Sequence, residues 1–173
     1  MEPRVHHNRE DLTGEHWFGD AGQALFAVAF VAVWILDTSV LHWTTMLDQY
    51  VPDWVQTILA AILLASAAIL ALASLRTVFG EVRDPPVVIR TGLFAYLRHP
   101  VYFSEVLFYV GLLVFRLSLA AAIVAVGAIV FLRMLCRYEE RLLVDRFGDE
   151  YREYMGEVPM WIPRIRRRGN RKS

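Results

Sequence analysis

Residues 92–105 read GLFAYLRHPVYFSE, and they place a polar cluster at the mouth of an apolar segment. The polar members of this cluster are Arg98, His99, Tyr102 and Glu105. Pro100 suits the first turn of a helix, because the N–H that proline lacks has no partner at that position. His99 then lies near the helix N-terminus, where free N–H groups and partial positive charge favour a bound anion. We therefore expect a helix to begin here and the cluster to bind a charged group.

One face of the expected helix carries the polar side chains. Tyr102, Glu105 and Tyr109 follow one another at spacings of three and four residues, which aligns them along a single helical face. Lipid would require apolar groups on an exposed face at this depth. The spacing therefore predicts that this face points into a helix bundle.

The composition is that of an integral membrane protein. The chain has 173 residues, of which 56% are hydrophobic, and its mean hydropathy is +0.38, which is too apolar for an ordinary soluble domain of this size. The formal net charge is zero, so charge gives no indication of nucleic acid as a partner. The single cysteine, Cys136, excludes an internal disulfide and a cysteine-based zinc site, and we expect it to pack inertly in an apolar helix.

Four apolar runs predict the membrane spans, at residues 21–46, 54–75, 101–115 and 117–136. The third run is shorter than the roughly 20 residues that a bilayer core demands of a helix. Only Arg116 separates the last two runs, which predicts an antiparallel helical hairpin. Alanine and serine in the second run favour close helix packing. We expect an all-α, polytopic membrane bundle of about four transmembrane helices.

The fourth helix is expected to continue beyond the membrane and to be followed by a short helical arm. The polar segment after Cys136 keeps a helical pattern as far as Gly148, which would act as the C-terminal cap. Asp149 could then cap a short helix that Gly156 closes. This divides the chain into a cytosolic arm, a bundle with its internal loop, and a C-terminal helix and arm, at residues 1–20, 21–136 (loop 76–100) and 137–173.

Several polar residues outside the cluster receive ordinary interpretations. Asp37 and His42 interrupt the first run near its end, from which both can reach interfacial water. The histidines of the first twenty residues are expected to be solvated rather than to bind a metal, and Trp17 and Phe18 to rest at the lipid headgroups. No secretory signal peptide is expected, because these residues contain no apolar core.

The placement of arginine predicts the orientation. The loop between the second and third runs carries Arg76, Arg83, Arg90 and Arg98, and arginines recur from Arg133 onward. The connector at 47–53 has none. By the positive-inside rule, both termini and the loop 76–100 face the cytoplasm. The polar cluster and the extension of the fourth helix then share one side.

That extension carries charges of both signs, including Arg137, Glu139, Glu140 and Arg141. Such a run is typical of a solvated, salt-bridged helix face. Alternatively, one carboxylate meets a cation bound beside the third helix, where arginines and glutamates together grip a zwitterion. The sequence pattern alone leaves both interpretations open.

These residues together resemble the isoprenylcysteine carboxyl methyltransferase and phospholipid methyltransferase family of integral membrane enzymes. The resemblance covers about residues 76–165, and its most specific parts are Arg98-His99-Pro100-x-Tyr102 and the pair Glu139-Glu140. Supporting parts are Phe147-Gly148-x-x-Tyr151-x-x-Tyr154, Val158-Pro159 and Pro163. The chain departs from the family pattern at Leu93 and Phe94, where proline and tyrosine are common.

The resemblance implies a bundle that binds S-adenosylmethionine on the cytosolic side and takes a lipophilic acceptor from the bilayer. By position, the cofactor-binding residues would be Gly92, Leu93, Tyr96, His99, Tyr102 and Glu140. The residues nearest the transferring methyl group would be Arg98, Glu139 and Glu140. Methyl transfer from a sulfonium is an in-line displacement that needs alignment and desolvation but no metal.

The acceptor and the rival functions stay open at this point. An isoprenylcysteine-like carboxylate is favoured because Arg98 could position it, and a phospholipid-type amine is the alternative, with a glutamate as base. A membrane reductase that uses NADPH is a second possibility, by distant similarity to sterol reductases. A scaffold whose basic tail, Arg164 to Lys172, binds anionic lipid is a third. The oligomeric state is not predicted.

Overall fold

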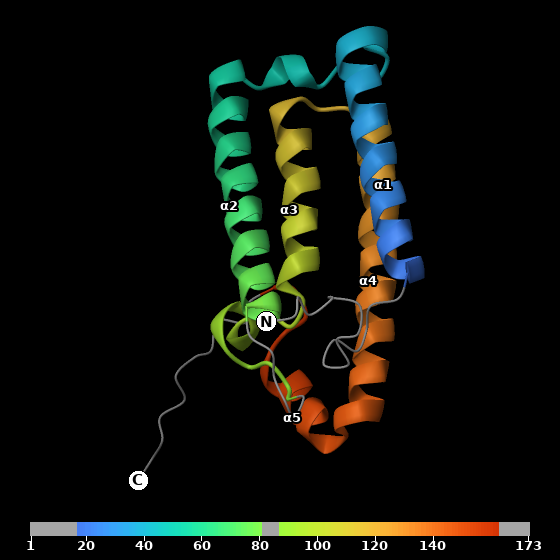
Figure 1. The fold of residues 1–173 in the computed structure, drawn as a ribbon. Helices are drawn as coiled ribbons and strands as arrows, with labels where there is room; N and C mark the ends of the chain where they lie inside the picture. Colours follow the sequence, from blue (N-terminus) through green and yellow to red (C-terminus); the bar gives the residue numbers. More distant parts are fainter. Residues whose placement is uncertain (1–16, 81–86, 163–173) are drawn as a thin grey trace, which may run out of the picture.

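A computed structural model describes residues 17–80 and 87–162, which contain helices and no strand (Figure 1). The longer helices are α1 (Trp17–Leu36), α2 (Asp53–Phe79), α3 (Pro100–Phe115), α4 (Leu119–Phe147) and α5 (Asp149–Glu157). Short helical turns occur at η1 (Asp37–Leu41), η2 (Asp48–Tyr50) and η3 (Gly92–Ala95). Three described helices are long and apolar enough to cross a membrane, and α3 is a shorter apolar helix. The expected all-α membrane bundle is confirmed.

The four long helices pack as two pairs. Helices α3 and α4 run antiparallel through a short connector, as the hairpin prediction required, but α3 packs mainly on α2 and α4 mainly on α1 (Figure 1). On α2, Ala60, Ala67 and Ser74 are buried at intervals of seven residues. A Cβ atom on Gly111 of α3 would lie only 2.9 Å from a methyl carbon of Leu64. Small side chains on these faces therefore let α2 and α3 approach closely.

In the second pair, α1 and α4, small residues of each helix also pack against large residues of the other. Ala121, Ala125 and Ala128 of α4 are buried in the main apolar core with Phe30 of α1. A Cβ atom on Gly22 of α1 would lie 2.4 Å from the Phe131 ring. This contact brings α1 against α4 rather than leaving α4 free to pack along α3.

The first span ends in a turn that Asp37 holds together. Helix α1 begins at Trp17, before the boundary expected from the sequence, and it passes through η1 to His42, whose φ of 53° is left-handed. Asp37 is only 4% exposed. It accepts hydrogen bonds from the backbone N–H groups of Trp43 and Thr44 and from the hydroxyls of Thr44 and Ser118, at 2.5–3.2 Å. The expectation of contact with water is wrong for Asp37, while His42 is exposed as expected.

The neighbouring connector is held by a second acidic residue. Asp48 accepts a hydrogen bond from Arg116 at 3.0 Å and another from the backbone N–H of Leu117 at 3.1 Å. Arg116 also reaches Asp53, at 2.9 Å, on the exposed side. Arg116, which separates the third and fourth apolar runs, therefore connects the end of α3 to the start of α2.

At the opposite end, α4 continues to Phe147 and Gly148 ends it, as expected. Gly148 has φ 60° and ψ −128°, a conformation open essentially to glycine. Asp149 begins α5 without capping it, and Gly156 lies inside α5 instead of closing it. The predictions for residues 1–16 and for the basic tail lie outside the described residues.

Candidate active site

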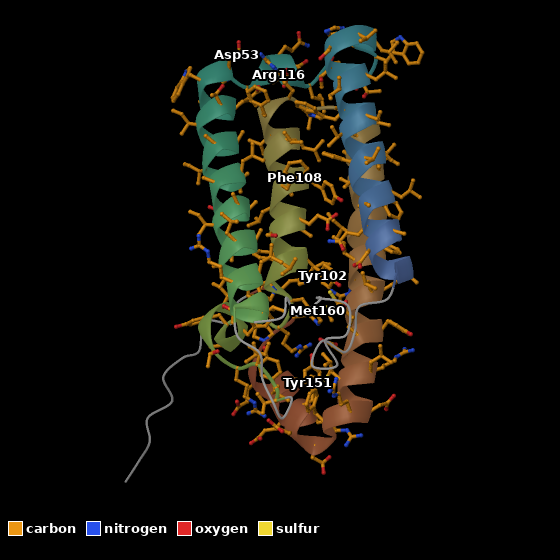
Figure 2. The ribbon with its side chains drawn as sticks, viewed as in Figure 1. Asp53, Tyr102, Phe108, Arg116, Tyr151 and Met160 are labelled. Carbon is orange, nitrogen blue, oxygen red and sulfur yellow. The ribbon has the colours of Figure 1, made fainter. Side chains whose placement is uncertain are left out.

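The polar cluster lies where α3 begins, at the end of the bundle that carries η3 and α5. Residues 158–162, called the arm here, follow α5 and return to the start of α3. Figure 2 shows Tyr102, Met160 and Tyr151 one beyond the other toward α5. The site is therefore bounded by α3, α4, α5 and the arm.

Arg98 connects α4 with α5 and the arm. Its Nε donates to Oε1 of Glu140 at 2.7 Å, and its Nη1 donates to the carbonyl oxygens of Met155 and Val158, each at 2.7 Å. The Arg98 backbone N–H donates to the carbonyl of Pro159 at 3.0 Å. With the side chain only 10% exposed, Arg98 is a buried connection between α4 and the arm.

His99 lies between the two glutamates of α4. Its Nε2 is 3.2 Å from Oε1 of Glu140 and its Nδ1 is 3.5 Å from Oε2 of Glu139. Burial opposes the charged imidazole, but Cys136, Glu139 and Glu140 outweigh it and raise the pKa of His99 well above its ordinary value. Cys136 is fully buried, in agreement with its expected packing role. The two flanking carboxylates therefore favour the charged form of His99.

Glu139 is the more exposed of the paired carboxylates. The Tyr102 hydroxyl donates to its Oε1, and the Tyr102 ring stacks beside His99 with ring centres 5.8 Å apart. The Glu139 side chain is 18% exposed, against 7% for Glu140. Because one side of Glu139 is still open, this carboxylate can meet a further cation, whereas Glu140 is enclosed by Arg98 and His99.

The tyrosines of α5 attach that helix to η3. The Tyr154 hydroxyl donates to the carbonyl of Phe94 at 2.7 Å, and the Arg90 guanidinium lies over the Tyr154 ring, 5.7 Å from its centre. Burial raises the pKa of Tyr154 to about 12, so its hydroxyl remains a donor at neutral pH. Arg90 also donates to the carbonyl of Glu150 at 2.6 Å. These contacts hold the turn that precedes α3 against the helix that follows α4.

The structure brings together Arg98, His99, Tyr102, Glu139 and Glu140, five of the residues predicted for the site. Gly92, Leu93 and Tyr96, whose backbone was predicted to contact the cofactor, lie on or next to η3, beside the hydrogen-bonded cluster of side chains and not in it. Gly92 has φ 61°, which favours glycine. The Tyr96 side chain is 68% exposed. Their role in binding a cofactor stays a prediction.

Two features of the site escaped the sequence analysis. Trp161 of the arm packs against the apolar core that includes Tyr109, and its indole N–H is buried without a partner among the described residues. Gln23 of α1 donates to Glu105 at 2.5 Å. Gln23 could have been found from the sequence, because a glutamine inside an apolar run indicates a polar partner. No local sequence pattern indicates that Trp161 belongs to the site.

Comparison with known families matches residues 55–150 to the phospholipid methyltransferase family. That range contains α3, α4, all but the first two residues of α2, and every residue of the polar cluster. The chain is also 32% identical, over 91 residues, to methanethiol S-methyltransferase 1 of Bradyrhizobium diazoefficiens. The alignment covers 49% of this chain and 29% of that relative, so the chain matches less than a third of the relative's length.

Proposed function

The chain belongs to the phospholipid methyltransferase family, and from this premise we propose that it transfers a methyl group from S-adenosylmethionine to a lipophilic acceptor in the membrane. The observation that carries the proposal is the arrangement at the start of α3. One partly exposed carboxylate, Glu139, is held by Tyr102 beside the enclosed Arg98–Glu140–His99 group. Such a site offers negative charge to a cationic ligand at the mouth of a membrane bundle.

The residues present fit S-adenosylmethionine, which has an ammonium, a sulfonium, a carboxylate and an adenine. Glu139 could accept from the ammonium, and the unpartnered N–H of Trp161 could donate to the carboxylate or to a ring nitrogen. A buried N–H without a partner costs free energy that a bound acceptor atom would recover. When bound, the cofactor would supply an electrophilic methyl carbon on a cationic sulfur, which would leave as a neutral thioether.

The chain's own contribution is alignment in a water-poor site. Arg98 and Glu140 fix the arm against α4, which sets the position of Trp161 relative to Tyr102. Because methyl transfer needs the nucleophile in line with the leaving sulfur, a rigid wall and exclusion of water supply much of the rate. We propose that Glu140 acts by holding Arg98 and His99, and that Glu139 meets the cofactor.

We also propose that the site faces the cytoplasm. The start of α1, η3 and α5 lie at one end of the bundle (Figure 1). Arg90 and Arg98 lie at that end, whereas Arg116 lies with Asp53 at the other end (Figure 2). This distribution matches the positive-inside rule.

The acceptor class has three candidates. A carboxylate like that of isoprenylcysteine follows from the role first expected for Arg98, and an amine lipid is the phospholipid-type alternative. The relative's printed name, a methanethiol methyltransferase, adds a thiol. In the structure Arg98 already binds Glu140 and two carbonyl oxygens, so its availability to a carboxylate acceptor is reduced.

Calorimetry with S-adenosylhomocysteine on the detergent-purified protein tests the proposed function. The wild type should bind, and Tyr102→Phe should weaken binding by about tenfold, because it leaves Glu139 without its hydroxyl donor. Glu157→Gln, which changes an exposed carboxylate on α5, is the matched control and should bind like the wild type. Binding of NADPH by a wild type that ignores S-adenosylhomocysteine would contradict the proposal.

A further inference from the structure

Glu105 is a membrane-embedded carboxylate on the same helical face as Tyr102. The two are three positions apart, so Glu105 lies about 4.5 Å further along α3, toward the middle of the bundle. Gln23 of α1 donates to its Oε2 at 2.5 Å, and the Tyr109 hydroxyl donates to its Oε1. Glu105 thus stands between α1 and α3, inward of Tyr102 along α3.

The hydrogen bonds of Glu105 leave room for another partner. An ionised carboxylate has about four acceptor positions, and two described donors reach Glu105. Its side chain is partly exposed. Asp37, by contrast, is buried and accepts four hydrogen bonds that close a turn. Ionisable groups in spans are costly and are retained where they act on a ligand or a partner.

The two cationic side chains of the polar cluster are already engaged. Within the described ranges, Arg98 is bound to Glu140 and the arm, and His99 lies between Glu139 and Glu140. Arg133 and Arg137 of α4 are on exposed positions. An anionic acceptor entering beside Tyr102 would therefore meet Glu105 and Glu139 in a medium of low dielectric, where like charges repel strongly.

We propose that Glu105 determines the acceptor class, and that the acceptor is a nucleophile that brings its own proton, a thiol or an amine, and not a carboxylate. The inference rests on the proposed methyl transfer. Gln23 and Tyr109 would orient the carboxylate toward the reacting group. The apolar remainder of the acceptor would lie among the bundle helices.

The step balances without a further reactant. For a thiol, the S–H bond breaks as Glu105 takes the proton, and the electron pair on sulfur forms the new S–CH₃ bond. The bond from the methyl carbon to the donor sulfur breaks, and its electron pair stays on that sulfur. For an amine, Glu105 pairs with the ammonium and takes the proton that the nitrogen must lose before it attacks. A carboxylate nucleophile has no proton to give to Glu105.

Three probes with one alkyl chain test the proposal: dodecanethiol, dodecylamine and dodecanoate. Each is titrated into detergent-purified wild type saturated with S-adenosylhomocysteine, with protein-free micelles as the blank. The thiol or the amine should bind at least about tenfold more tightly than dodecanoate, because of charge repulsion by Glu105. With a labelled methyl donor, the methylated product identifies which of the two is the acceptor class. Equal or tighter binding of dodecanoate, or its methylation, would overturn the proposal.

Glu105→Gln tests the residue itself. It removes the charge at nearly constant volume, so the discrimination against dodecanoate should fall to about threefold or less, while S-adenosylhomocysteine binding stays within about twofold of the wild type. Glu157→Gln is the control and should keep the full discrimination. Unchanged discrimination in Glu105→Gln would also overturn the proposal. The wild-type titrations still test the proposal if Glu105→Gln does not fold. If S-adenosylhomocysteine binds normally but the acceptor probes are not discriminated, the role of Glu105 is wrong and the proposed function still stands.

Discussion

The two ends of the helix bundle use similar side chains for different purposes. At the end without α5, Asp37 and Asp48 accept hydrogen bonds from backbone and hydroxyl groups of the connectors, and Arg116 bridges Asp48 and Asp53. At the α5 end, Arg98 and Glu140 meet across 42 residues of sequence. There, Glu139 keeps an exposed side. The difference indicates that the buried carboxylate of Asp37, which closes a connector, is saturated with donors, whereas Glu139 has capacity for one more contact.

Glu140→Ala should have the largest effect. Removing one partner of a buried pair leaves Arg98 and His99 without their shared counter-charge, which costs about 3–5 kcal/mol of stability. The arm should loosen with it, so S-adenosylhomocysteine binding should be lost. Thermal unfolding followed by tryptophan fluorescence, together with calorimetry, would measure both. A variant that unfolds at a lower temperature but binds S-adenosylhomocysteine normally would show that the Arg98–Glu140 pair is purely structural, like the aspartates at the opposite end.

Asp37→Ala should cost less and should act only on stability. It leaves the hydroxyls of half-buried Thr44 and buried Ser118 without their acceptor, for a loss of about 2–3 kcal/mol. The S-adenosylhomocysteine affinity of the folded variant should stay within about twofold of the wild type, because the turn lies at the opposite end. Asp37→Asn keeps one acceptor oxygen and should lose less. Weakened binding by folded Asp37→Ala would mean that the two ends are coupled.

The smallest effect should come from pH, acting through His99. Because the pKa of His99 is raised in the folded protein, the stabilisation from its charge is full below its ordinary pKa of about 6.5. It is lost as pH rises through the raised value. Stability and S-adenosylhomocysteine affinity should therefore decline from neutral to alkaline pH, by less than the Asp37→Ala loss. In His99→Asn that decline should be absent. An equally steep profile in this variant would assign the titration to another group.

Local signals predicted the helices and the members of the polar cluster. Pro100 fixed the start of α3, and Gly148 fixed the end of α4, because each residue has a backbone restriction that acts within one turn. The polar spacing of Tyr102 and Glu105 indicated an inward face, and Glu105 does contact α1. The sequence therefore indicated which residues belong to the site, although their chemical roles stay predictions.

Contacts between distant segments could not be predicted in the same way. The pairing of α3 with α2 depends on Leu64 meeting Gly111, and no pattern within either segment specifies that match. Asp37 was expected to contact water because it lies near the end of its apolar run, and no local pattern indicates its partner Ser118, which lies 81 residues away in the chain. The engagement of Arg98 by carbonyl oxygens of α5 and the arm likewise has no side-chain signature, since every residue has a carbonyl.

That last feature has an evolutionary consequence. The bonds that dock the arm end on the carbonyl oxygens of Met155, Val158, Pro159 and Met160. Substituting these side chains leaves the acceptors in place, so docking constrains the path of the backbone more than the identity of the residues. The side chains of the arm can therefore diverge, and adapt the wall of the site to a different acceptor, while the connection to Arg98 and His99 is inherited unchanged.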